Sequence, residues 1–420
     1  MGTFMTQENK NLWSKLGPGM LYAAGAVGVS HLVQATRAGA DYGLGLSLVI
    51  IIACLIKYPS IRFGGDYAAA TGTSLISSYR KEGWWAFSIY AFAQLFSMAF
   101  MIAAISLFAL GLLKATLGFE VSNILGCVLL LGVMVAFLLS GKYHLLEKLT
   151  KYLVVILTLL IFSATVLVVP RVDWSPANFA FPTFSPQLIF YLVALVGFMP
   201  TPSDASVLTS VWACAKSDCE GRRVDPDDTR LDFNIGYIGS TVLALCFLIL
   251  GAGVMHRNGV VVDPSNGGFA TQLIELFTST IGGWSFPLIA TSAVFVILST
   301  LLTVLDGMTR IAVGIVDECR VQTFDVATKQ KAYSIGIVIL CTASVFVIGT
   351  MMKSFATFLD ITSIIVFIIS PLLAFLNHRA ITSKRVAVEL QPSKSLRLWS
   401  LCSAWFLTVL TLIYFYVRLT

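Results

Sequence analysis

The chain has 420 residues, of which 57% are hydrophobic and only 12% are charged, and its mean hydropathy is +0.85. Because soluble domains carry about 25% charged residues, this composition excludes a soluble globular protein and predicts a membrane protein. The formal net charge of +6 does not indicate nucleic-acid binding, because it arises from short loops between apolar stretches, where Lys and Arg determine membrane topology.

Apolar stretches of about 20 residues, the length that crosses a bilayer as a helix, recur along the chain after a polar segment at 1–16. They leave short loops and no room for a separate soluble domain. The sequence therefore predicts one all-α polytopic membrane protein. Its eleven predicted transmembrane helices lie at residues 16–36, 43–61, 87–113, 121–141, 152–170, 181–215, 233–255, 284–305, 332–352, 354–377 and 398–417.

The distribution of Lys and Arg predicts how these helices are oriented, since cytoplasmic loops are enriched in positive charge. With the N-terminus inside, 22 of the 28 Lys and Arg residues, Lys57 among them, fall in or beside cytoplasmic segments. Residues 1–16 lack the apolar core of a signal peptide and are predicted to form a cytoplasmic tail, which places the C-terminus outside. The basic residues on the outer side are Arg37, Lys114, Arg171, Arg257, Lys353 and Arg418.

Two predicted spans carry residues that interrupt a helix at membrane depth. The first reads Gly-Ala-Val-Gly-Val-Ser-His at 25–31, and the sixth reads Gly-Phe-Met-Pro-Thr-Pro-Ser-Asp at 197–204. Proline removes a backbone donor and clashes with the preceding turn, so the sixth helix should break. A broken helix is tolerated in a membrane only where it lines a cavity or is buried in protein.

The positions of the two breaks predict a repeat. Breaks at corresponding positions of two halves indicate the binding site of a secondary transporter. From hydropathy alone, we predict five-helix repeats at residues 17–170 and 181–377, followed by an additional helix at 398–417.

His31 and Met199, at the two breaks, are candidate cation ligands. Imidazole binds cations or relays protons near neutral pH, and a thioether favours transition metals. The alternative for His31 is a neutral ring hydrogen-bonded to backbone carbonyls that the break has freed. The alternative for Met199 is an ordinary role in filling space in the core.

Three acids lie nearest membrane depth. Asp204 follows the two prolines and either caps the second half-helix or faces the cavity. Asp306 either forms an ion pair with Arg310 four residues later, as a cap or a gate, or contacts substrate. Asp360 lies within the tenth span, and an acid inside a membrane span is by default a candidate functional residue. 

Arg37 follows the break of the first span, on the outer side of the predicted membrane. It is a candidate for an outer gate with Asp41 or with an acid in the cavity. The alternative is a guanidinium that reaches out of the membrane to water.

The sequence contains no motif of an enzyme or of an ATP-driven pump. There is no His-Glu-x-x-His, no Gly-x-Ser-x-Gly and no Walker lysine loop. The eight cysteines include no Cys-x-x-Cys pair and no spacing typical of zinc sites, so no cofactor is expected.

Short motifs in the chain resemble the natural-resistance-associated macrophage protein (NRAMP) family of divalent-metal transporters, in particular its divergent bacterial members. The resemblance follows the first ten spans in order. It implies a leucine-transporter-like inverted repeat in a bacterial cytoplasmic membrane, with substrate held between the broken first and sixth helices. The motifs are Gly17-Pro18-Gly19, Ala38-Gly39-Ala40-Asp41-Tyr42-Gly43, Ala70-Thr71-Gly72-Thr73-Ser74-Leu75, Leu146-Glu147-Lys148, Met199-Pro200, and Ser299-Thr300 before Gly307.

The chain departs from the family pattern at its binding motifs. Family members carry Asp-Pro-Gly-Asn in the first span and Met-Pro-His in the sixth. Here the first motif reads Gly28-Val29-Ser30-His31, and the second reads Met199-Pro200-Thr201. The methionine is retained, but both the ligand aspartate and the acid that the family carries in its third span are missing.

The resemblance implies a secondary transporter that moves a cation, with a divalent metal favoured, by alternating access. Gly28, Ser30, His31, Met199, Thr201 and Asp204 are the predicted substrate-binding residues, and Arg37, Asp306 and Asp360 are the predicted coupling or gating residues. For a metal substrate the predicted ligands are His31, Met199 and Asp204. A coupling ion and the lipid bilayer are the other expected partners. The alternatives are a transporter of the same fold for a small organic cation or zwitterion, and a sensor that does not transport.

Overall fold

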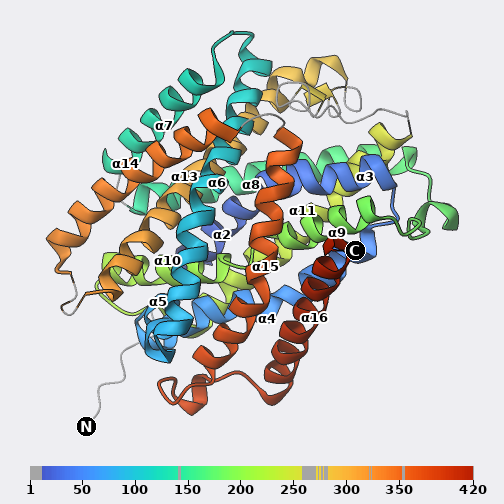
Figure 1. Ribbon diagram of the computed structural model, residues 1–420. Coiled ribbons are helices and arrows are strands. Elements are labelled where there is room, and N and C mark those ends of the chain that lie inside the picture. Colours follow the sequence, from blue (N-terminus) through green and yellow to red (C-terminus); the bar gives the residue numbers. More distant parts are fainter. Residues whose placement is uncertain are drawn as a thin grey trace.

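A computed structural model describes residues 12–140, 143–257, 271–272, 274–275, 278, 282–320, 322, 324–351 and 355–419 of the chain. Within these ranges the regular secondary structure is entirely helical (Figure 1).

Nine helices in the described part of the chain are long and apolar enough to cross a membrane. They correspond to nine of the eleven predicted spans. These helices are α4 (Ser47–Thr71), α6 (Trp84–Leu117), α7 (Asn123–Ser140), α8 (Tyr143–Val168), α11 (Pro226–Leu250), α13 (Phe286–Glu318), α14 (Val326–Met351), α15 (Phe355–Ile381) and α16 (Lys394–Leu419).

The first and sixth predicted spans are each built from shorter pieces, which confirms the predicted breaks. The first consists of α2 (Pro18–Ala26), a π-helical turn η1 (Ser30–Ala35) and α3 (Thr36–Tyr42). The sixth consists of α9 (Pro186–Phe198) and α10 (Ala205–Glu220), joined by an unwound segment at 199–204. Because neither span is one continuous helix, the total of eleven stays a prediction.

Short elements complete the described chain and lie mostly at the ends of the long helices. They are α1 (Leu12–Lys15), α5 (Leu75–Glu82), the π-helical η4 (Gly251–His256), and the single 3-10 turns η2 (Val169–Arg171), η3 (Pro176–Phe179), η5 (Gly283–Ser285) and η6 (Val388–Leu390).

Several helices extend beyond the predicted apolar spans, and two of these extensions have the same physical reason. The second span was expected to end at residue 61, but α4 continues to Thr71, and Arg62 forms an ion pair with Asp66 inside it (3.0 Å). The eighth predicted span covers residues 284–305, and α13 continues beyond it to Glu318. Charged residues lower the local hydropathy without ending the helix, since their charges are paired between adjacent turns.

The broken spans occupy the interior of the helix bundle. In Figure 1, α2 and α10 lie behind α6 and α15. The first half of the first span packs against α8, α11 and α13, and α10 packs against α4. Two glycines allow this closeness: a Cβ at Gly64 of α4 would lie 1.8 Å from the Ser206 oxygen of α10, and a Cβ at Gly236 of α11 would lie 2.2 Å from the Gly19 oxygen of α2.

Candidate substrate site

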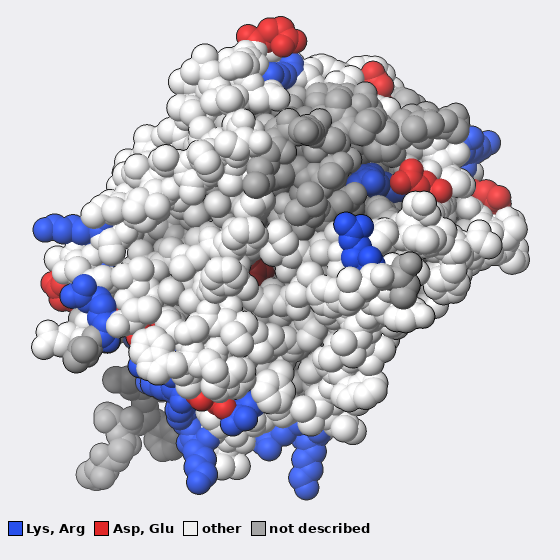
Figure 2. All heavy atoms as spheres, viewed as in Figure 1, with Lys and Arg blue, Asp and Glu red and all other residues white. Residues whose placement is uncertain are grey.

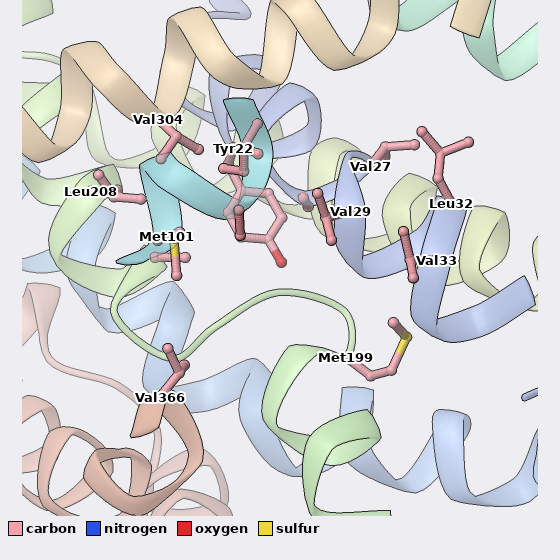
Figure 3. Packing of buried hydrophobic residues seen from close by; sticks show 14 of the residues in the cluster. Tyr22, Val27, Val29, Leu32, Val33, Met101, Met199, Leu208, Val304 and Val366 are labelled. Carbon is pink, nitrogen blue, oxygen red and sulfur yellow. The ribbon is translucent and has the colours of Figure 1, made fainter. Parts of the chain in front are cut away.

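A cavity of about 40 Å³ lies where the two breaks meet. A site needs about 10–15 Å³ on this measure to hold one water, so the space suits a few waters, a partly hydrated ion or a small solute. Figure 3 shows several of the apolar side chains around it. The lining residues are Tyr22, Gly25, Val29 and Ser30 of the first span, Phe198, Thr201, Pro202, Asp204, Ala205, Leu208 and Trp212 of the sixth, Met101, Ala104 and Ile105 of α6, Thr300 and Val304 of α13, and Thr362 of α15.

Asp204 supplies the carboxylate among these lining residues. It is the residue before the first turn of α10, 4% exposed, and its side chain does not cap that helix. Its Oδ2 accepts a hydrogen bond from Gln94 Nε2 of α6 (3.3 Å). The positive end of the α10 dipole stabilises a carboxylate at this position. In Figure 2, acidic atoms are visible deep inside a hollow in the middle of the face, surrounded by uncharged side chains.

Ser30 and Thr201 line the same cavity from the opposite breaks. Ser30 Oγ donates to the Ala26 carbonyl and contacts His31 Nδ1 (2.9 Å). The structure therefore brings together three of the predicted substrate-binding residues, namely Ser30, Thr201 and Asp204.

His31 is completely buried and does not line the cavity. Its Nε2 lies 2.7 Å from the Ser240 carbonyl of α11, and its Nδ1 lies 2.8 Å from the Ala26 carbonyl, which the break has freed. These contacts match the structural alternative derived from the sequence, in which the ring bonds to backbone carbonyls. In this conformation His31 joins the first span to α11, and its role as a cation ligand stays a prediction.

Met199 is also completely buried and absent from the cavity wall. Figure 3 shows its thioether pointing toward Val33 of the first span, away from Tyr22 and Met101. The predicted ligand set of His31, Met199 and Asp204 is therefore not assembled around one point. In the described part of the chain no three His, Cys, Asp or Glu side chains cluster as a metal site.

Gly28, the position of the missing family aspartate, packs against α13 and does not line the cavity. A Cβ there would lie 2.4 Å from Thr300 Cγ2. Thr300 in turn donates from Oγ1 to the Ala24 carbonyl (2.7 Å), one of the carbonyls left free by the break. A larger residue at position 28 would displace a threonine that satisfies this backbone group.

We expect Gly28→Ala to destabilise the protein by about 1–3 kcal/mol, the usual cost of overpacking a core. Gly25→Ala is the matched control, because the nearest atom to a Cβ there is 3.8 Å away. Thermal unfolding of the two variants in detergent measures the difference. Equal stability of the two variants would contradict the proposed packing of Gly28 on Thr300.

Sequence analysis missed two residues beside this site, Gln94, which donates to Asp204, and Lys57. Lys57 was counted as a cytoplasmic positive charge, but it is completely buried in α4, and its Nζ donates to the Gly197 carbonyl (2.7 Å) and the Thr201 carbonyl (3.1 Å). The available signal was a lone lysine within an apolar span, which by default marks a functional or structural site.

Two of the predicted gating residues, Arg37 and Asp306, do not line the cavity. The Arg37 guanidinium lies over the Tyr191 ring (5.3 Å), which connects α3 with α9. Asp306 accepts hydrogen bonds from Arg310 Nε (2.8 Å), Trp212 Nε1 (3.1 Å) and Tyr333 OH (2.8 Å), so the predicted ion pair with Arg310 is present. The side chain of Asp360 lies outside the described residues. Gating by these three residues stays a prediction.

A bundle of membrane-length helices, with two of its spans broken around a buried cavity, defines a multi-pass membrane transporter. The model of the natural resistance-associated macrophage protein-like (Nramp) family matches residues 19–417, nearly the whole chain. The chain therefore belongs to the NRAMP family, whose members are transporters and not enzymes.

Similar proteins agree with this assignment. A curated relative, described as uncharacterized protein PM0681 of Pasteurella multocida (strain Pm70), is 36% identical over 324 residues, which cover 73% of each chain. A variant of the Eremococcus coleocola manganese transporter has a TM-score of 0.69 at 14% identity, over 98% of this chain and 89% of that one. MhsT in complex with L-phenylalanine has a TM-score of 0.66 at 13% identity, over 95% of this chain and 98% of that one. These structural likenesses confirm the predicted leucine-transporter-like fold.

Proposed function

We propose that this NRAMP-family transporter moves a divalent metal cation through the cavity between the two breaks, with Asp204 as the residue that attracts the charge. The observation that carries the proposal is a buried carboxylate on a cavity lined by both broken spans. A cation that leaves water needs anionic or polar oxygen ligands to replace its hydration shell. Asp204, Ser30 and Thr201 provide oxygen atoms on this wall.

This ligand set favours a hard cation. Oxygen ligands suit magnesium and manganese, whereas soft metals prefer sulfur. The thioether of Met199 points away from the cavity, and the ligand motif expected from the family resemblance is incomplete here. We therefore expect manganese or magnesium to bind in preference to cadmium, with water completing the coordination shell. Similarity to a manganese transporter supports the first of these two metals.

A small organic cation or zwitterion is the second candidate cargo. Most lining side chains are apolar, and the Lys57 ammonium interacts electrostatically with Asp204, which offsets the negative charge of the carboxylate. Proteins of similar fold have been solved with L-phenylalanine and with a hydantoin bound. In this case the half-helix ends would bind the charged groups of the solute.

We also propose that the protein resides in the cytoplasmic membrane with its N-terminus inside. Lys and Arg side chains project from the lower edge of the molecule in Figure 2, on the side of α5 and of the connection between α15 and α16. This asymmetry supports the orientation, even with Lys57 removed from the cytoplasmic count.

The test is binding and transport by the purified protein. Isothermal titration with manganese, magnesium and cadmium is expected to give saturable heats for the two hard metals, and vesicles containing the protein should accumulate the bound metal. If none of the three metals binds to folded protein, the divalent-metal proposal is wrong and organic solutes become the candidates. Binding without accumulation would support the sensor alternative.

A further inference from the structure

The Lys57 ammonium has an unusual position for a charged group in a membrane protein. It lies near the middle of α4 and is completely buried, and its hydrogen-bond acceptors are one carbonyl in the last turn of α9 and one in the unwound segment of the sixth span. No carboxylate in the described part of the chain forms an ion pair with it within 4.0 Å. A buried charge without a contacting counter-ion is costly, so these carbonyls must replace its hydration shell.

The break explains why carbonyls are available at this point. In an intact helix the Gly197 carbonyl would accept from the backbone N–H of residue 201, but α9 ends at Phe198. The carboxyl end of α9 also carries the negative end of its helix dipole. Two convergent carbonyls and a negative dipole end form the kind of environment that binds a cation in discontinuous membrane helices.

Asp204 occupies the complementary position on the other half of the span. It precedes α10, at the positive end of that helix dipole, and interacts electrostatically with Lys57 across the unwound segment. A positive charge thus lies at the end of one half-helix and a negative charge at the start of the other. Both charges favour the broken arrangement over a continuous helix.

We propose that the Lys57 ammonium is a tethered cation: it fills, at the break of the sixth span, a site that would otherwise hold a free monovalent cation. The four-carbon side chain of Lys57 extends from α4 and places the ammonium between the two carbonyls. These hydrogen bonds hold the broken span in place without a free ion. Removing the stem should leave a site for a small primary ammonium ion between the Gly197 and Thr201 carbonyls. This inference does not depend on which solute the transporter moves.

Chemical rescue tests the proposal. Thermal unfolding of purified Lys57→Ala is measured with ammonium, methylammonium, ethylammonium or tetramethylammonium chloride at constant ionic strength. Lys57→Ala is expected to unfold at a lower temperature than the wild type, and ethylammonium should raise that temperature saturably. At ten times its dissociation constant, the ion would increase the ratio of folded to unfolded protein about 11-fold. Tetramethylammonium has no N–H to donate and should have no effect.

Two further variants separate the effect of charge from that of packing, and the Lys57 site from the site of another buried lysine. Lys57→Met keeps most of the side-chain volume without the charge, so it should be destabilised and should not respond to ethylammonium. Lys216→Ala removes a lysine that also donates to backbone carbonyls, those of Leu16 (3.2 Å) and Lys15 (3.5 Å), but beside the carboxylate of Glu147 (3.9 Å). It controls for a general effect of ammonium ions and should not be rescued.

The outcomes separate cleanly. Rescue of Lys57→Ala by primary ammonium ions alone supports the proposal, whereas equal stabilisation of the wild type or of Lys216→Ala overturns it. Wild-type stability in Lys57→Met would also overturn it, since the charge would then be dispensable. If Lys57→Ala yields no folded protein, purification with and without ethylammonium becomes the readout: recovery only with the ion supports the proposal, and failure in both overturns it. The unfolding measurements contain no transported metal or solute. Their result therefore stays valid if the divalent-metal proposal fails.

Discussion

Replacement of Asp204 by Asn is expected to reduce cation affinity by roughly 100-fold or more, which corresponds to about 2.7 kcal/mol. The substitution preserves size and removes the charge from the carboxylate on the cavity wall. A cation in a buried cavity has little solvent screening, so the loss of a direct anionic partner costs far more than it would on a surface. Titration calorimetry on the folded variant, with the metal that binds the wild type, measures the loss.

Met199→Leu is the matched control for Asp204→Asn. Met199 belongs to the same unwound segment and is also buried, but its side chain points away from the cavity. We expect its affinity for a hard metal to stay near that of the wild type. Loss of binding in Met199→Leu with retention in Asp204→Asn would reverse the proposed assignment and return the thioether to the ligand set predicted from the family motif.

Replacement of Asp232 by Ala is expected to release the amino-terminal end of α2, at a cost of about 2–3 kcal/mol. Asp232 of α11 is buried, and its Oδ2 accepts from the backbone N–H groups of Gly17 (3.0 Å) and Gly19 (2.7 Å). The first N–H groups of a helix have no partner within that helix, so this carboxylate supplies one from another span. The Lys216 ammonium donates a hydrogen bond to the carbonyl of Leu16, which precedes these residues (3.2 Å).

Cysteine labelling measures this release. In a background with the eight native cysteines replaced, Met20→Cys introduces a thiol at a position that is 4% exposed. Adding Asp232→Ala should raise its rate of modification by a thiol reagent roughly 30-fold or more, because the population of the open form follows the free energy of local opening. Asp228→Asn is the control: this acid of α11 pairs with Lys15 (3.1 Å) at a partly exposed position, so its loss should change the rate little. Equal rates in the two variants would contradict the capping role of Asp232.

The sequence by itself determined that the chain is an all-α membrane protein and where two of its spans break. Hydropathy decides which segments enter a bilayer, and Pro200 and Pro202, only two residues apart, remove two backbone donors and clash with the preceding turn. These properties are local, so no partner was needed to predict them. Hydropathy alone does not include the charged ends of α4 and α13 in these spans, because paired charges such as Arg62 with Asp66 lower the local hydropathy without ending the helix.

Only the tertiary structure decided which side chains face the cavity. The spacing of His31 and Met199 at the two breaks suggested a shared site, but the π-helical turn at η1 changes the direction of the side chains around it, and His31 faces Ser240 of α11. Lys57 shows the converse: it lies 140 residues before the Gly197 carbonyl that it binds, and no local pattern connects them. A broken helix leaves carbonyls and N–H groups to be satisfied by whichever helices pack beside it, and that packing is a property of the whole bundle.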